Sequence, residues 1–510
     1  MGRKLSGMVM TSKNTISSGL TNRKKIHNAV SLAVLCIIIP FLAIYIDPIF
    51  ILAKYKLRIA NGSILHDFLQ KEVEASRLLV YVYNVSNAER FLSGEDEKLS
   101  VQEVGPFIYQ EYRTNEDIHF DTAAGVVRFI PRFRAKFVEE GSFGRPEDTI
   151  LVTPYIPYLS ATSFFSTYPF MIKSVYSMWV KQHAPKPIRT IDVHKYLWGY
   201  RDKILDLCNT LVPGLVYYNT IGVLDRLYDY DADYIVDMDI TNSKKFQVRS
   251  VLKTRRKKTW NVSDLVDTKL EFKDTYEGAA FPPEMTPQTK LNFYRPGICK
   301  TLAMEYSGTT PMELGPEAFV YRLTNDTFAN KHLCDSKGVC PQGVIDLSSC
   351  FYGLPIAVTK TRFLDVDPAF ADRIEGIHAN RDEDDSYLVV EPKIGLTVEI
   401  SLTLQLNLLL GDISYMPDLA KFKDLLVPIA HVKMTLPELP GATKNSLKLL
   451  YVTGPQILLG LEIVSWGLGL ILIVYSLKLA CHEWFTQRRT LRRKDNNLKG
   501  KVSAELPLIS

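Results

Sequence analysis

The sequence predicts a mixed α+β membrane protein in which two transmembrane helices flank one large domain that is mainly β. Three observations lead to this fold class. Two long apolar stretches lie near the two ends of the 510-residue chain. Between them, several segments alternate apolar and polar residues with the period of a strand. All four N-glycosylation sequons also fall between the two apolar stretches.

The first apolar stretch runs from Ala29 to Ile46 and is interrupted only by Ser31 and Pro40. Its length is close to what one bilayer crossing needs. A cleaved signal peptide is the alternative, but this run is too long for one and begins too far from the N-terminus. We therefore expect a cytosolic tail over 1–28 and an uncleaved transmembrane helix over 29–53.

The second apolar stretch runs from Ile457 to Ser476 and carries one charge, Glu462. A buried core helix is the alternative, but the basic cluster that follows at 488–494 is typical of a stop-transfer sequence. We expect a transmembrane helix over 456–480 and a cytosolic tail over 481–510. Basic residues lie beyond the outer end of each stretch, which places both tails in the cytosol.

The segment 54–455 is then expected to be a lumenal or extracellular domain. Its sequons predict that it is glycosylated, at Asn61, Asn84, Asn261 and Asn325. Basic residues at 54, 56 and 58 are a counter-signal to which we give less weight. Of the 61 basic and 56 acidic residues, this segment holds 47 and 51. The basic excess therefore belongs to the two ends, which argues against a nucleic-acid-binding domain.

Five cysteines fall in this domain, and four of them cluster: Cys299, Cys334, Cys340 and Cys350. An oxidising compartment would pair them. The sequence alone permits three pairings. The short Cys334–Cys340 loop together with Cys299–Cys350 is the preferred one, and it leaves Cys208 free. A zinc site is disfavoured, because only His332 lies near the cluster and no Cys-x-x-Cys spacing occurs.

Hydrophobic periodicity predicts several elements inside the domain. Residues 66–80 have the pattern of an amphipathic helix, and residues 160–182 form an apolar, aromatic helical stretch. Residues 126–137 and 396–410 alternate with a period of two, which predicts strands. Pro131 predicts an edge or a bulge in the first of these strands. Its basic face is expected to be solvated surface.

The sequence lacks the common catalytic fingerprints. No nucleophile elbow, zinc-protease motif, P-loop or dinucleotide-binding motif occurs. The acidic runs at 231–239 and 382–386 lack the glycine and the terminal glutamate of a calcium loop. We expect a protein that is not an enzyme, with no catalytic residues, no cofactor and no metal site.

Several stretches, in order along the chain, resemble the class B scavenger receptor family, which includes fatty-acid translocase and the type-two lysosomal integral membrane protein. They are EVGPFIYQEYR (103–113), YLWGYRD (196–202), FPPE (281–284), GVIDLSSC (343–350) and YLVVEPKIGLTVEISLTLQLNLLL (387–410). The resemblance implies a large irregular antiparallel β-barrel with an apical helical cap and an internal tunnel. Such a tunnel carries lipids between the cap and the membrane. The implied partners are fatty acids, sterols, phospholipids or lipoprotein particles.

The resemblance also points to a ligand entrance at the cap. The family attracts anionic ligands there with basic residues, and the matching positions are Lys173 and Lys181. The aromatic side chains expected beside them are Phe164, Phe165, Phe170 and Trp179.

Other functions remain as alternatives. The lysosomal relative binds a hydrolase through a histidine-bearing apical helix, but the stretch around Pro169 has no histidine. A sorting receptor that carries a lumenal protein to lysosomes is therefore the second hypothesis. A sensory co-receptor for lipidic ligands is the third. A two-span ligand-gated channel fits poorly, because its external domain usually has about ten or more cysteines.

The chain ends in AELPLIS, in which Glu505, Leu508 and Ile509 resemble an acidic dileucine sorting signal. Clathrin adaptor complexes are the partners of such signals. The acid lies three residues before the leucine, whereas four is usual. We expect a late endosomal or lysosomal membrane location, with the plasma membrane as a transit stop. Gly2 fits the myristoylation pattern, and Cys481 is a palmitoylation candidate by position.

Overall fold

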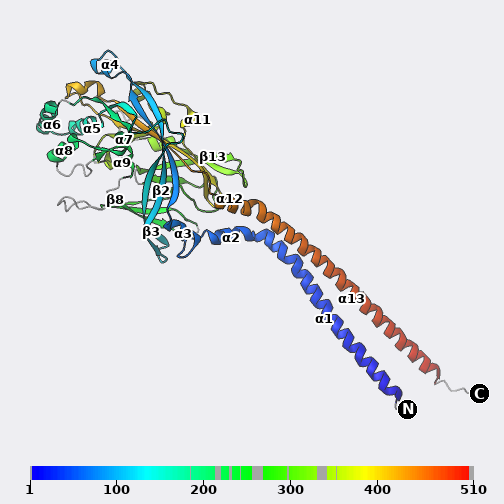
Figure 1. Ribbon diagram of the computed structural model, residues 1–510. Helices are drawn as coiled ribbons and strands as arrows, with labels where there is room; N and C mark the ends of the chain where they lie inside the picture. Colours follow the sequence, from blue (N-terminus) through cyan, green and yellow to red (C-terminus); the bar gives the residue numbers. More distant parts are fainter. Residues whose placement is uncertain are drawn as a thin grey trace, which may run out of the picture. The chain divides into compact units, whose positions relative to one another are not determined.

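The structure, a computed structural model, describes residues 3–183, 185–212, 220–228, 232–241, 243–255, 268–295, 298–329, 342–351 and 353–504. The chain forms two compact units. One comprises Met1–Tyr55 with Ala442–Ser510, and the other comprises Lys56–Gly441. The first is helical and the second is built on a large sheet, which confirms the mixed α+β class (Figure 1).

Two long helices that run side by side make up most of the first unit (Figure 1): α1 (Arg3–Ile46) and α13 (Gly454–Ala504). The helix α2 (Pro48–Lys56) follows α1, while α12 (Gly441–Lys448) and the π-helical turn η6 (Leu449–Thr453) precede α13. By length and composition, Arg23–Ile46 and Gly441–Arg493 are candidate membrane spans. The two predicted apolar stretches lie within them.

The two helices are antiparallel, and small residues hold them together. A Cβ atom added at Gly469 would lie 3.3 Å from Ile37 Cγ1 and 3.4 Å from the carbonyl oxygen of Ala33. Ser465 Oγ donates a hydrogen bond of 2.9 Å to the carbonyl oxygen of Cys36. Such close backbone approach is how helices associate in lipid, where water does not drive them together.

A sixteen-stranded sheet forms the second unit, and its main path is almost entirely antiparallel. In spatial order the strands are β10 (Thr268–Glu271), β9 (Val248–Arg255), β8 (Ala232–Asp239), β3 (Val126–Val138), β2 (Leu99–Asp121), β1 (Val73–Val85), β20 (Leu426–Thr435), β19 (Leu396–Leu409), β18 (Tyr387–Glu391), β14 (Ala318–Leu323), β13 (Ile298–Thr310), β12 (Leu291–Arg295) and β11 (Thr275–Tyr276). Off this path lie β15 (Val344–Asp346), β16 (Ile356–Lys360) and β17 (Ile374–Glu375). Two small ladders pair β4 (Ile150–Pro154) with β5 (Ile188–Asp192) and β6 (Tyr200–Arg201) with β7 (Thr220–Ile221).

The described strands form an open path and not the closed barrel that the family resemblance implied. The path ends at β10 on one side and at β11 on the other. One isolated bridge, between Gln247 and Tyr276, joins the residue before β9 to β11. A single bridge is not a ladder, so closure stays unconfirmed, and so does the tunnel.

Helices and short turns surround the sheet. The helices are α3 (Ile64–Gln70), α4 (Ala88–Ser93), α5 (Ile156–Ser166), α6 (Phe170–His183), α7 (Val193–Trp198), α8 (Lys203–Leu211), α9 (Val223–Tyr228), α10 (Pro368–Ala371) and α11 (Arg381–Asp384). The 3₁₀ turns include η1 (Asn325–Phe328), η3 (Ser348–Cys350), η4 (Thr361–Phe363) and η5 (Pro417–Phe422). Figure 1 shows α5, α6 and α8 gathered at one side of the sheet.

The helix predicted over 66–80 is wrong beyond its first turn. It ends at Gln70, and β1 begins at Val73. Leu78, Val80 and Val82 alternate with more exposed residues and are buried in the core. β1 pairs with β2 on one side and with β20 on the other. The helical pattern at 73–80 was coincidental, because the β-branched and aromatic residues that follow favour a strand once a sheet is there to pair with.

The two predicted strands are confirmed as β3 and β19. β3 pairs with β8 only over Val126–Phe129, so from Pro131 onward that edge has no ladder partner among the described residues. The basic face of β3 is not simply solvated, because Arg128 binds Asp237 at 2.7 Å and Arg132 binds Asp233 at 2.6 Å, both on β8.

Candidate ligand-entrance site

The predicted entrance lies on a helical hairpin formed by α5 and α6. Proline cannot continue a helix, and Pro169 accordingly separates the two. Its carbonyl oxygen accepts the backbone N–H groups of Ile172 and Lys173, which begins α6. The predicted helical stretch over 160–182 is therefore confirmed as two helices with a break between them.

A buried contact fixes α6 against α5. The hydroxyl of Tyr176 lies 2.8 Å from Thr162 Oγ1, and the Tyr176 ring packs on Phe165 with a centroid distance of 4.7 Å. Burial raises the pKa of Tyr176 well above its ordinary value, so the hydroxyl stays protonated and can donate. One side of α6 is therefore buried in the core.

The opposite side of α6 exposes large apolar side chains. Phe170 is 80% exposed, Met171 78%, Met178 61% and Val175 47%. These four residues, the α6 apolar face, recur at helical spacing on one side of the element. Exposed apolar surface of this kind on a soluble domain marks an interaction site.

The structure distributes the predicted entrance residues over both sides of the hairpin. Phe170 belongs to the α6 apolar face, and Lys181 is exposed one helical turn beyond Met178. Phe165 is fully buried, and Phe164 is half-buried where it packs on Gly353, at which a Cβ would lie 2.8 Å from its ring. Trp179 is half-buried and stacks on His183, with centroids 3.9 Å apart. Their roles in ligand binding stay predictions.

The loop that follows β19 completes this region and was missed by sequence reasoning. Lys173 Nζ lies 5.8 Å from the centre of the Tyr415 ring, and Tyr415 Oη donates to the carbonyl oxygen of Thr162 at 2.9 Å. Lys173 is therefore half-buried, held between the ring and the carbonyl oxygen of Ser166 at 3.4 Å. Tyr415 lies more than 200 residues from α5 in sequence, and no local pattern indicates the contact.

Asp202 lies at the base of the region formed by helices α5 to α9, which we call the helical region. Its carboxylate caps α8 by accepting the N–H of Ile204 at 2.9 Å, and it accepts the Tyr155 hydroxyl at 2.7 Å. Arg189 lies between the rings of Tyr155 and Tyr200, 4.4 and 4.2 Å from their centres, and 3.7 Å from Asp202. Burial, with Asp202 as the second cause, raises the pKa of Tyr155. These contacts therefore hold the start of α8 against the segment that precedes α5.

Trp198 links the helical region to the sheet. Its ring meets Tyr109 of β2 edge-on at 5.3 Å and stacks on Tyr228 at 5.8 Å. A side chain at Gly199, which has φ +99°, would lie 3.2 Å from Thr220 and Asp225, so glycine allows the turn after α7.

Two buried ion pairs connect strands that are far apart in the order of the sheet. Glu111 on β2 pairs with Arg295 on β12, and it also accepts Ser76 Oγ at 2.6 Å. Arg113 on β2 pairs with Glu277, just after β11, at 2.8 Å. Because neither β11 nor β12 neighbours β2 in the sheet, the sheet curls enough to bring these strands within side-chain reach of β2.

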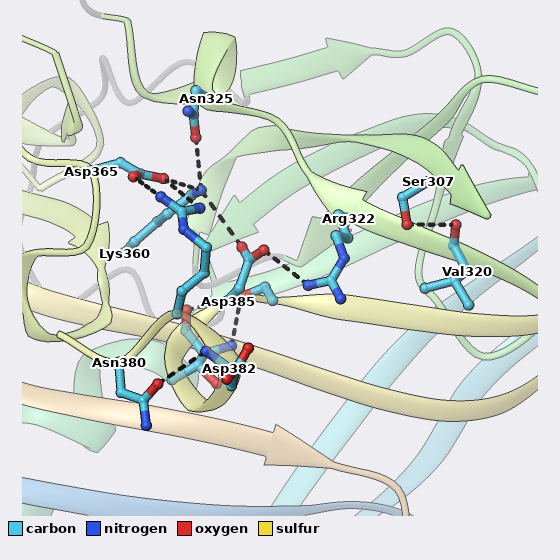
Figure 2. A network of polar contacts seen from close by, with 12 residues as sticks. Ser307, Val320, Arg322, Asn325, Lys360, Asp365, Asn380, Asp382 and Asp385 are labelled. Carbon is cyan, nitrogen blue, oxygen red and sulfur yellow. Dashed lines mark hydrogen bonds and ion pairs between the residues drawn. The ribbon is translucent and has the colours of Figure 1, made fainter. Parts of the chain in front are cut away.

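A second polar network lies around Lys360, whose side chain is almost fully buried (Figure 2). Its ammonium group donates to Asn325 Oδ1 at 2.7 Å and to Asp365 at 2.9 Å, and it lies 3.6 Å from Asp385. Asp385 also binds Arg322 at 2.9 Å. A buried lysine needs such partners, because an unpaired buried charge is costly.

The predicted glycosylation sites lie in different surroundings. Asn61 and Asn325 are exposed, and the bond from Lys360 uses only the oxygen of Asn325. Asn84 is half-buried within β1, and its Oδ1 accepts the N–H of Val152 at 2.8 Å. Asn261 lies outside the described residues.

The structure describes only part of the predicted cysteine cluster. Cys350 is disulfide-bonded, and its partner lies outside the described side chains. The pairings of Cys299 with Cys350 and of Cys334 with Cys340 therefore stay predictions. Cys208 is free and buried, and burial raises its pKa to about 12. Cys481 is free and exposed. Gly2, Glu505, Leu508 and Ile509 lie outside the described residues.

No metal site is present among the described residues, in which no three His, Cys, Asp or Glu side chains are placed to hold an ion. What the helical region offers is instead an exposed apolar face with a lysine at its end. Such an arrangement suits non-covalent binding of an amphiphile.

Comparison with known proteins agrees with the resemblance. The model of the CD36 family matches residues 29–480. Scavenger receptor class B member 1 of Bos taurus is 25% identical over 403 residues, which cover 78% of this chain and 77% of the relative. Lysosome membrane protein 2 of Homo sapiens is 23% identical over 436 residues, which cover 84% of this chain and 88% of the relative.

Proposed function

Because this chain belongs to the CD36 family, we propose that it is a scavenger-type lipid receptor and transporter that does no covalent chemistry. Its segment 54–455 forms a glycosylated domain outside the cytosol, and fatty acids, sterols or other lipids pass through that domain to the membrane. Both tails lie in the cytosol. The two candidate membrane spans and the relatives named as a scavenger receptor and a lysosome membrane protein support this proposal.

The α6 apolar face is the observation that carries the proposal. Exposing four large apolar side chains to water costs free energy of about 25 cal/mol for each Å². A lipid chain that covers them recovers this free energy. Lys181 at the end of the face supplies a positive charge for a carboxylate or phosphate headgroup, and Lys173 lies on the side toward Tyr415.

A late endosomal or lysosomal membrane is the proposed location, with passage through the plasma membrane. The C-terminal dileucine-like signal would be bound there by clathrin adaptor complexes. The lysosomal name of one group of relatives favours this location, whereas the other group is named as scavenger receptors. A sorting receptor for a lumenal protein is the second candidate function, because the same apolar face could cover a protein surface.

Native mass spectrometry of the purified full-length protein tests the proposal directly. We expect bound fatty acid, sterol or phospholipid in the wild type. Lys173→Glu with Lys181→Glu should reduce the anionic lipids that are retained, because the headgroup loses its partners. Phe170→Ser with Met171→Ser should reduce all retained lipids, because the apolar face is broken.

A matched control separates the site from general charge. Lys71 and Lys136 are exposed lysines outside the helical region, and changing both to Glu should leave the retained lipid unchanged. A wild-type protein that is empty and also takes up no added lipid would contradict the transport proposal. It would move the sorting-receptor function to first place.

A further inference from the structure

The helix α13 extends well beyond the length of a membrane span. Its 51 residues correspond to about 77 Å at about 1.5 Å per residue, whereas the hydrocarbon core is about 30 Å thick. The apolar stretch ends near Lys478, and the helix continues through the following basic segment. Residues 481–493 are therefore a helix that emerges at the surface of the bilayer.

The side chains of this segment are segregated between two faces of the helix. At 3.6 residues per turn, one face gathers two aromatic residues and four arginines: Trp484, Phe485, Arg488, Arg489, Arg492 and Arg493. We name these six residues the basic-aromatic face. The opposite face holds Glu483, Thr486, Gln487 and Thr490.

Contacts within the segment match this division. The Arg488 guanidinium lies 4.3 Å from the centre of the Trp484 ring, and the Trp484 and Phe485 rings meet edge-on at 5.0 Å. On the other face, the Thr486 and Thr490 hydroxyls donate to backbone carbonyl oxygens one turn earlier, at 2.7 and 3.1 Å. Across the described residues, no carboxylate forms an ion pair with any of the four arginines.

This arrangement costs stability unless something covers it. Arg488 and Arg492 are four residues apart, as are Arg489 and Arg493, and like charges at that spacing destabilise a helix. A stop-transfer sequence needs positive charge but no particular face. The collection of arginines and aromatic rings on one side therefore calls for an anionic partner.

We propose that the basic-aromatic face binds the phosphorylated headgroup of a phosphoinositide in the leaflet from which α13 emerges. Arginine presents a planar fork that suits phosphate oxygens better than the point charge of lysine, and all four basic residues on the face are arginines. Tryptophan and phenylalanine favour the membrane interface. When bound, the basic-aromatic face contacts the headgroup layer, and the opposite face, which holds Thr486 and Thr490, points toward water.

Two features of the segment favour a lipid over a protein partner. The segment follows the candidate span directly, so clustered basic residues meet the headgroups of the same leaflet before any other anion. The face also combines rings that enter the interface with charges that stay at its surface. The placement of this anion in the cytosolic leaflet rests on the membrane topology that belongs to the proposed function.

The test uses the full-length protein in nanodiscs, in which both leaflets are accessible and the result does not depend on cellular topology. Nanodiscs of phosphatidylcholine contain either a small fraction of a phosphatidylinositol bisphosphate or phosphatidylserine at equal total charge. Native mass spectrometry then counts the lipids that the released protein retains. We expect the phosphoinositide to be retained about tenfold more than phosphatidylserine, because its clustered phosphate oxygens can accept several planar arginine forks at once.

A rearranged variant provides the matched control. Gln487→Arg, Arg488→Gln, Arg489→Thr and Thr490→Arg together keep the composition and net charge but divide the arginines between the two faces. The proposal expects this variant to lose most of the phosphoinositide preference, as should Trp484→Ala with Phe485→Ala. Arg23→Gln, Lys24→Gln and Lys25→Gln on α1 should leave it unchanged.

Several outcomes would overturn the proposal. Equal retention of phosphatidylserine and phosphoinositide would show a nonspecific charge effect, as would full retention by the rearranged variant. If neutralising the four arginines leaves lipid retention unchanged but abolishes binding of adaptor complexes, the face is a protein-docking site. None of these results affects lipid binding at α6, because that is measured with the Lys173 and Lys181 variants.

Discussion

His431 on β20 shows how burial sets the charge of a single residue. It is 2% exposed, with the Tyr81 ring stacked on it at 4.6 Å and the Tyr83 hydroxyl 3.1 Å from Nδ1. Glu103 lies 3.6 Å from the same nitrogen, but Arg362 already binds that carboxylate at 2.9 and 3.0 Å. The carboxylate is therefore engaged elsewhere and does not draw a proton onto the imidazole.

The pKa of His431 follows from these surroundings. Burial lowers it, and the charges of Arg362 and Lys433 lower it further, to about 3. In the unfolded chain the pKa of a histidine is about 6.5. Because the folded-state pKa lies below the unfolded one, protonation favours unfolding. Stability is then lost as pH falls below about 6.5, by about 1.4 kcal/mol per unit until about pH 3.

We therefore predict that His431 destabilises the folded domain by about 2 kcal/mol at pH 5 relative to pH 7. His431→Gln should remove that part of the loss. The measurement is the free energy of urea unfolding at both pH values, followed by tryptophan fluorescence. His378 is exposed and serves as the control, since His378→Gln should keep the full loss. An unchanged pH dependence in His431→Gln would refute the assignment.

Among the elements, the two candidate spans show how a proline can create a helix contact. Pro40 has no N–H, so the carbonyl oxygen of Cys36, four residues earlier, loses its helical partner. Ser465 on α13 donates to that oxygen at 2.9 Å. In hydrocarbon an unpaired carbonyl is costly, and the serine therefore ties α13 to the position where α1 needs a donor.

Ser465→Ala should weaken the pairing of α1 with α13 by about 1 kcal/mol. In a Pro40→Ala background the same change should cost almost nothing, because the restored N–H of residue 40 satisfies Cys36. Unfolding in mixed micelles of increasing SDS content, done on both single variants and the double variant, gives the coupling free energy. Additive effects of the two changes would mean that Ser465 does not replace the missing donor.

Elements with a regular local pattern could be predicted from the sequence, whereas their partners could not. The period of two identified β3 and β19, since alternation is a property of neighbouring residues. It did not reveal that the polar residues of β19 are also buried, for example Gln405 and Asn407, each 0% exposed. Their hydrogen bonds lead to Thr359 on β16, which only the folded chain brings near.

The candidate site was predictable to a similar extent. The aromatic stretch over 160–182 predicted helices, but not that Phe165 is buried while Phe170 is exposed. The ion pairs Arg295–Glu111 and Arg113–Glu277 were missed, because their partners lie more than 150 residues apart. Removing one partner from such a buried pair costs about 3–5 kcal/mol, yet no local signal marks it.

For the whole molecule, antiparallel packing of α1 and α13 has a consequence for topology. Ser465 contacts Cys36 and Gly469 lies against Ala33. The N-terminal end of α1 and the C-terminal end of α13 therefore lie at the same end of the helix pair. Two helices that both cross the membrane in this arrangement would leave the N-terminal and C-terminal tails in one compartment. The basic residues at 23–25 and 488–493 lie at that end of the candidate spans, and the positive-inside rule supports the proposal that this side is the cytosol.

The proposed cytosolic location of both tails would make the C-terminal signal available for sorting, and this gives the last prediction. Leu508→Ala with Ile509→Ala should move the protein from late endosomes and lysosomes to the cell surface, because adaptor complexes no longer retrieve it. Surface biotinylation with quantitative imaging measures the shift. Leu506→Ala is the matched control, since it removes an apolar residue outside the pair. If the double variant keeps the wild-type distribution, the pair is not the signal. Retention would then have to come from another part of the tails, with the arginine-bearing segment of α13 the first to test.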